Sequence, residues 1–140
     1  MPSFQNGSVE IAYLDEGDGK PILLVHGFAS TKEVNWVNPG WVSTLKRAGR
    51  RVIALDDRGH GQSSKLYDPA DYHTGLMAED VRALMDHLGI GHADVMGYSM
   101  GAHVLGHQPC VVVGRIVELR RLAVAAVVER DHPPPRPLQR

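Results

Sequence analysis

The chain has 140 residues, 43% hydrophobic and 22% charged, a composition typical of one globular domain and not of a disordered or collagen-like chain. Fifteen basic and sixteen acidic residues give a formal net charge of -1, so no overall field favours nucleic acid or an acidic membrane surface as a partner. The single cysteine, Cys110, excludes an internal disulfide, and the first residues lack the regions of a signal peptide. We therefore expect a cytoplasmic protein that does not span a membrane.

The first predicted elements are strands. Residues 3–5 and 9–13 flank Asn6-Gly7, a strong signal for a two-residue hairpin turn. Residues 22–25 and 52–55 form continuous apolar runs, which indicate strands that are buried on both faces. These two runs are therefore expected to be central, parallel strands.

Two segments with helical spacing separate the strands. Residues 39–48 end before Gly49, and residues 72–88 end before Gly89, so each has a glycine in the position that commonly terminates a helix. A further strand is expected over residues 93–98. The fold class predicted is α/β, with an antiparallel hairpin leading into a mostly parallel sheet that has helices on both faces, and with ligands beyond the carboxyl ends of the strands.

The composition changes after His107. Residues 1–107 hold nine basic and thirteen acidic residues, whereas residues 108–140 hold six arginines, three acidic residues and five of the nine prolines. The second segment has neither a clean strand period nor a clean helix period. We therefore expect an α/β domain over residues 1–107 and a divergent tail rich in Arg, Val and Pro over residues 108–140.

The sharpest motif is Gly97-Tyr98-Ser99-Met100-Gly101, a G-x-S-x-G where a predicted strand meets a predicted helix. This context predicts a nucleophile elbow, in which Ser99 is the nucleophile and the two outer glycines leave room for the sharp turn. A strand-to-helix turn with Ser99 as an ordinary helix cap is the alternative.

His26-Gly27-Phe28 follows the first buried strand and is expected at the same edge of the sheet. An oxyanion hole needs main-chain donors at this edge, and the backbone N–H groups of Phe28 and Met100 are the candidates. His26 is expected to point back toward the sheet and to have a structural role.

Two other patterns have part of the residue spacing of a ligand site. The Gly59-His60-Gly61 turn lacks the third glycine and the lysine of a phosphate-binding loop. His103, His107 and Cys110 have metal-ligand spacing, but Pro109 interrupts their helix. The sequence therefore predicts no cofactor and no metal.

Together, His26-Gly27-Phe28, Asp56-x-Arg58-Gly59-His60-Gly61-x-Ser63 and the Ser99 motif resemble the α/β-hydrolase fold superfamily over about residues 4–106. A serine at the elbow is similar to esterases, lactonases, C–C bond hydrolases and cofactor-free haloperoxidases, whereas dehalogenases and epoxide hydrolases carry aspartate there. The resemblance implies a serine hydrolase that acts on a small ester, lactone or similar carbonyl substrate. It leaves the substrate and the oligomeric state open.

In this superfamily an acid and then a histidine follow the nucleophile. Asp131 and His132 have that order, but they are adjacent and precede three prolines, so neither can brace the other while reaching Ser99. No triad acid or histidine is identified, and the resemblance implies that residues 1–107 are a partial α/β-hydrolase domain. The second hypothesis is therefore a catalytically incomplete hydrolase, from a frameshifted or degenerate gene, that at most binds a ligand or partner.

The strand expected over residues 93–98 has no clear successor in the sequence. An unpaired apolar edge promotes aggregation unless another segment covers it. Residues 122–128 are apolar, contain three β-branched valines and are long enough to be a substitute strand.

Overall fold

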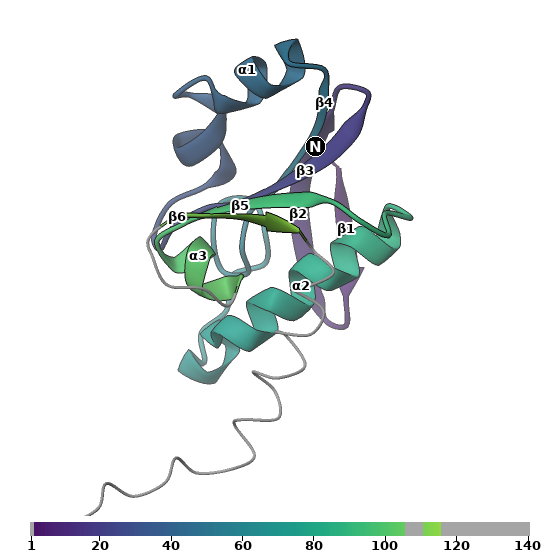
Figure 1. The fold of residues 1–140 in the computed structure, drawn as a ribbon. Coiled ribbons are helices and arrows are strands. Elements are labelled where there is room, and N and C mark those ends of the chain that lie inside the picture. Colours follow the sequence, from purple (N-terminus) through teal and green to yellow (C-terminus); the bar gives the residue numbers. More distant parts are fainter. Residues whose placement is uncertain (1, 106–110, 116–140) are drawn as a thin grey trace, which may run out of the picture.

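The structure is a computed structural model that describes residues 2–105 and 111–115. These residues form one sheet in the order β1-β2-β4-β3-β5-β6, with helices on both faces (Figure 1). The strands are β1 (Ser3–Asn6), β2 (Val9–Glu16), β3 (Lys20–Val25), β4 (Arg50–Leu55), β5 (Asp94–Tyr98) and β6 (Val111–Arg115). The helices are α1 (Trp41–Arg47), α2 (Thr74–His87) and α3 (Met100–Val104), with a π-helical turn η1 (Glu33–Val37) and a 3-10 turn η2 (Pro69–Tyr72).

The sheet is parallel at its centre. β3 lies between β4 and β5, with Ile22 opposite Val52 on one side and Asp94 on the other. β1 and β2 form the predicted hairpin, and Gly7 at its turn has φ +62°, a value that favours glycine. β2 then continues antiparallel along β4. The predicted α/β fold class is confirmed.

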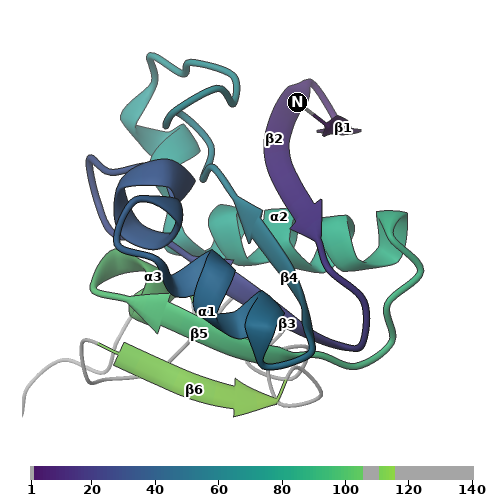
Figure 2. The same cartoon turned by 90° about the horizontal axis from the view of Figure 1, so that it is seen from above.

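The continuous apolar strands are explained by two separate cores. On β3 and β4, alternate residues such as Leu23 and Ile53 pack in a core that includes α2 and α3 residues. The residues between them, such as Leu24 and Ala54, pack with Trp36 of η1 and Val42 of α1 on the other face. Because both faces are covered, neither strand shows a polar alternation. Figure 2 shows α1 and α2 on opposite faces of the sheet.

Both predicted helices are shorter than their sequence patterns. Residues 39–48 form a helix only from Trp41, because Gly40 before it has φ +92° and stands outside the helix. Residues 72–88 form a helix only from Thr74, since η2 precedes it and the Asp68 side chain caps that turn by accepting the Ala70 N–H at 2.9 Å. The turn η1 was not predicted.

The expectation that β5 lacks a partner is wrong. β6 pairs antiparallel with β5, and Val95 lies opposite Gly114 (Figure 2). The covering strand therefore comes from Val111–Arg115, a segment without a regular sequence period. The substitute strand expected at residues 122–128 lies outside the described residues.

The boundary predicted between residues 107 and 108 also falls at residues that the structure does not describe, so it stays a prediction. Over the described ranges, no helix has the length and apolar character needed to cross a bilayer.

Candidate active site

Ser99 stands at the sharp turn between β5 and α3. Its backbone has φ 51° and ψ -111°, and Ala29 is the other non-glycine residue with positive φ among those described. A residue held in such a region costs about 1–3 kcal/mol and persists only when its surroundings impose it. Ser99 is also exposed, so a strained serine is presented at the carboxyl edge of the sheet.

The two outer glycines of the Ser99 motif make this turn sterically possible. A Cβ at Gly97 would lie 2.7 Å from the Gly101 carbonyl carbon and from a Leu105 methyl carbon. A Cβ at Gly101 would overlap the Val25 carbonyl oxygen. The start of α3 therefore packs directly against the end of β3, with no space for a side chain between them.

The chain after β3 passes beside Ser99. Val25 lies opposite Gly97 in the parallel ladder, so the two strands end at the same level. A Cβ at Gly27 would be 3.6 Å from the Ser99 Cβ. Phe28 and Met100, whose N–H groups are the predicted oxyanion donors, thus lie one residue beyond Gly27 and directly after Ser99. Neither N–H donates a hydrogen bond within the described part of the chain.

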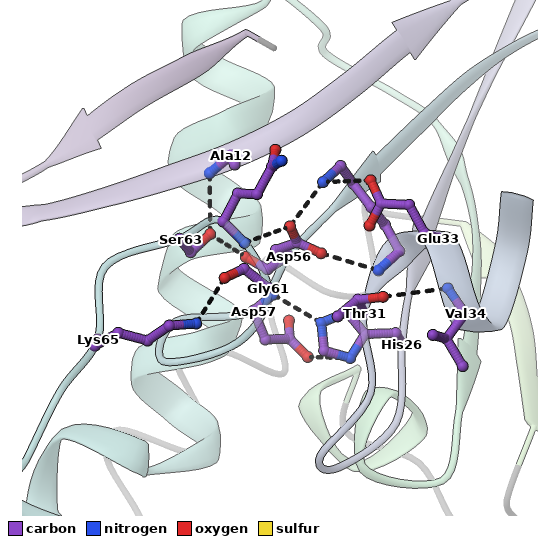
Figure 3. A network of polar contacts seen from close by, with 12 residues as sticks. Ala12, His26, Thr31, Glu33, Val34, Asp56, Asp57, Gly61, Ser63 and Lys65 are labelled. Carbon is purple, nitrogen blue, oxygen red and sulfur yellow. Dashed lines mark hydrogen bonds and ion pairs between the residues drawn. The ribbon is translucent and has the colours of Figure 1, made fainter.

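His26 is an internal link. Its Nε2 accepts the Asp57 N–H at 2.9 Å (Figure 3). Its Nδ1 lies 2.7 Å from the Gly27 carbonyl oxygen, so the proton belongs on Nδ1. Burial lowers the pKa of His26 and keeps the ring neutral. These contacts give His26 the structural role that its position suggested.

A buried ion pair joins the loops that follow β3 and β4. Lys32 donates to Asp56 twice, from its Nζ at 2.7 Å and from its backbone N–H at 2.9 Å, and Gln62 donates its N–H at 3.0 Å (Figure 3). Burial alone would raise the pKa of Asp56, but these hydrogen bonds outweigh it and lower that pKa. The carboxylate thus fixes the relative position of the two loops.

The rest of the Asp56–Ser63 motif braces the same region. Arg58 forms a bidentate ion pair with buried Asp80, at 2.7 and 2.8 Å. Ser63 Oγ donates to the Asp56 carbonyl oxygen at 2.6 Å and accepts the Ala12 N–H at 2.9 Å (Figure 3). These polar side chains are engaged within the fold, as expected of a structural loop.

Sequence reasoning missed two residues that hold the loop beside Ser99. Asn35 Oδ1 accepts the Gly27 N–H at 2.8 Å, and His60 Nε2 accepts the Ala29 N–H at 3.1 Å. The Asp56–Ser63 motif contains His60, but no local pattern in the sequence pairs His60 with Ala29. Asn35 lies in η1, a turn that has no sequence signal.

Two hollows flank this edge. One hollow, of about 520 Å³, is lined by several aromatic side chains, which include Phe28, His60 and Tyr72. The exposed Tyr67 also lines it. The other, of about 230 Å³, is lined by Asn35, Trp36, Trp41, Met96 and Tyr98. The first places an apolar surface next to the predicted oxyanion donor Phe28.

No acid or base is in place at Ser99 among the described residues: no histidine, aspartate or glutamate there hydrogen-bonds its hydroxyl. His103, in α3, is exposed. His107, Cys110, Asp131 and His132 lie outside the described residues. The described ranges also hold no group of three His, Cys, Asp or Glu side chains arranged to bind a metal ion.

Residues 20–105 match the family model described as "alpha/beta hydrolase fold". The chain is 38% identical over 111 residues to the dihydrolipoyllysine-residue acetyltransferase component of an acetoin cleaving system from Pseudomonas putida, covering 79% of the chain and 28% of that protein. It is 38% identical over 96 residues to a putative non-heme chloroperoxidase from Synechocystis, covering 69% of the chain and 33% of that protein.

Solved structures give the same result. An epoxide hydrolase from Vigna radiata superposes with a TM-score of 0.67 at 25% identity, covering 74% of this chain and 32% of that one. Est816, an N-acyl homoserine lactone degrading enzyme, superposes with a TM-score of 0.63 at 32% identity, covering 74% of this chain and 38% of that one. The chain thus spans well under half the length of these proteins. It belongs to the alpha/beta hydrolase fold family.

Proposed function

We propose that Ser99 is the nucleophile of a hydrolase that acts on a small ester, lactone or similar carbonyl substrate. The observation that carries this proposal is the strained backbone of Ser99, which presents its side chain at an exposed turn between β5 and α3. A serine at this position suits acyl chemistry, and a lactone-degrading enzyme is among the structural relatives.

In the proposed reaction, Ser99 Oγ attacks the carbonyl carbon and the carbonyl oxygen gains the negative charge. The N–H groups of Phe28 and Met100 stabilise this oxyanion. The Oγ proton passes to a base, the alcohol leaves with a proton, and water then hydrolyses the acyl-enzyme. The aromatic hollow beside Phe28 supports a neutral, largely apolar substrate, since none of its lining side chains is an acid, a lysine or an arginine.

The alternative is a catalytically incomplete member of the family that binds a ligand without turning it over. The observation that favours it is that no described acid or base contacts the Ser99 hydroxyl. Without a base, the serine stays weakly nucleophilic, because removing the histidine of a serine triad costs about a factor of 10⁶ in kcat.

A fluorophosphonate probe separates the two, because it labels an activated serine without requiring a known substrate. We expect mass spectrometry to find the label on Ser99 of the full chain. Ser99→Ala should abolish labelling, and Ser43→Ala should leave it intact, since Ser43 is an exposed serine of α1. A folded wild-type chain that is not labelled at Ser99 would overturn the proposal and favour the incomplete hydrolase.

A further inference from the structure

We propose that His60 is a positioning residue for the oxyanion hole, because its imidazole holds the Gly27-Phe28-Ala29 turn that carries the Phe28 N–H. The catalytic consequence rests on the proposed function. The hydrogen bond itself is a property of the fold and can be tested without activity.

The environment of the His60 ring fixes its tautomer. Nδ1 lies 3.0 Å from the Arg58 carbonyl oxygen, which can only accept, so Nδ1 carries the proton. Nε2 is then left with a lone pair, and it accepts the Ala29 N–H at 3.1 Å. The His60 ring therefore connects the loop after β4 with the loop after β3.

The loop after β3 needs this restraint. Ala29 has φ +54°, a conformation that is unfavourable for a residue with a side chain. The hydrogen bond within the turn, from the Ser30 N–H to the Gly27 carbonyl oxygen, is long at 3.3 Å. Asn35 holds Gly27 and His60 holds Ala29, so the turn is fixed on both sides of Phe28. The Phe28 N–H, between these two anchors, is left without a partner in the described residues.

The ring is also held in place by its neighbours. His60 is only 7% exposed, and its ring centroid lies 5.1 Å from that of His26 and 6.4 Å from that of Tyr72. The Tyr72 hydroxyl donates to the Leu66 carbonyl oxygen at 2.6 Å, which anchors the Tyr72 side of this packing. A Cβ on the preceding Gly59 would overlap the Tyr72 ring, so the turn that carries His60 is packed tightly against it.

The first measurement needs no variant. In the ¹⁵N-labelled full chain we expect a scalar coupling across the hydrogen bond between the Ala29 amide nitrogen and His60 Nε2. Protonation of Nε2, or a ring flipped so that Nδ1 faces Ala29, would remove this coupling. Either result would overturn the assignment of the acceptor.

Variants then test the consequence for the turn. His60→Phe keeps a ring but has no acceptor, whereas His60→Gln places a carbonyl oxygen near the position of Nε2. We expect amide exchange at Ala29 to be about three- to tenfold faster in His60→Phe, the factor that one net hydrogen bond supplies, and to be partly restored in His60→Gln. His87→Phe is the matched control, because His87 stacks on Phe4 at the far end of α2. Equal exchange at Ala29 in the wild type and His60→Phe would overturn the proposal.

The rate of fluorophosphonate labelling tests the link to catalysis. Losing one oxyanion donor costs about 10²–10³ in rate, so His60→Phe should slow labelling by about tenfold or more, with partial rescue in His60→Gln. His87→Phe should label at the wild-type rate. Faster Ala29 exchange with unchanged labelling would refute the positioning role. Absence of labelling in the wild type would instead refute the proposed function, and the exchange data would still decide the hydrogen bond.

Discussion

Asp57 is a buried carboxyl without a hydrogen bond to either oxygen among the described residues. His26 Nδ1 lies 3.7 Å from Asp57 Oδ2, too far for a hydrogen bond, and it contacts the Gly27 carbonyl oxygen at 2.7 Å instead. Burial, followed by the charges of Asp80 and Asp56, raises the pKa of Asp57 well above its ordinary value. The folded protein therefore holds a proton on Asp57 at pH values where the unfolded chain releases it.

This difference predicts the pH dependence of stability. Because the pKa of Asp57 is raised in the folded state, the protonated carboxyl contributes to the free energy of unfolding. This contribution is fully present below the unfolded pKa of 3.8, and it is lost as the pH rises through the pKa of the folded state. We expect Asp57→Asn to raise the free energy of unfolding at pH 7 by about 1–3 kcal/mol, and to raise it less at pH 4.5.

Urea unfolding of the wild type and of Asp57→Asn between pH 4.5 and pH 7 measures this difference in the free energy of unfolding. The titration of His26 has the opposite effect on stability, because its pKa is lowered in the folded state and stability is lost as the pH falls below 6.5. Since wild type and variant share His26, the difference between their free energies of unfolding at one pH largely removes this contribution. Asp18→Asn, at an exposed turn, is the control. If the free energies of unfolding of Asp57→Asn and wild type differ by the same amount at every pH, the prediction is contradicted.

Gly101, the second outer glycine of the Ser99 motif, has no space for a side chain. Gly101→Ala places a Cβ on the Val25 carbonyl oxygen. Because a backbone atom of a central strand cannot easily move away, we expect the free energy of unfolding to fall by about 1–3 kcal/mol. Gly91→Ala is matched, since open space surrounds a Cβ there, and should change stability by less than about 0.5 kcal/mol. If chemical denaturation gives Gly101→Ala and Gly91→Ala the same free energy of unfolding, α3 can move away from β3.

At the scale of elements, the pairing of β6 with β5 decides whether the sheet has an open apolar edge. The backbone of Val111–Arg115 pairs with that of Asp94–Tyr98 along its whole length. We expect a chain that ends at residue 110 to aggregate, because β5 would lose these hydrogen bonds and expose an edge. A chain that ends at residue 115 keeps β6 and is the control.

Size-exclusion chromatography with light scattering distinguishes these two chains. Larger species are expected for the chain that ends at residue 110, at equal protein concentration. If both chains elute alike as monomers, β6 is not needed to protect the edge.

The sequence identified the elements that rely on local chemistry. The hairpin at Asn6-Gly7 and the apolar runs of β3 and β4 were predicted because turn residues and β-branched residues favour those structures locally. β6 was missed because its pairing depends on the edge that β5 leaves open, and the segment itself has no clean period. The turn η1 is short, so its form depends on what packs around Trp36 more than on propensity.

The position of the site can be predicted from the sequence, but the contacts that hold the site together cannot. The Ser99 turn could be predicted since the glycines around it have a specific steric function. The links Lys32–Asp56 and Ala29–His60 join residues 24 and 31 positions apart in sequence. Their proximity follows from β4 lying beside β3 in the sheet, and no local pattern encodes that order.

These links have a mechanical consequence. Because Lys32, Ala29 and the His26 ring are each hydrogen-bonded to the loop after β4, we expect the rim beside Ser99 to move as one stiff body and not as two flexible loops. Opening either loop breaks the same bonds, so the amides of Ala29, Lys32 and Asp57 should exchange with one common opening free energy. Native-state hydrogen exchange in low urea measures it, and separate opening energies would mean two independent loops. For the proposed hydrolase, a stiff rim would favour substrates that already fit the hollow beside Phe28, so we expect selection by shape to precede chemistry at Ser99.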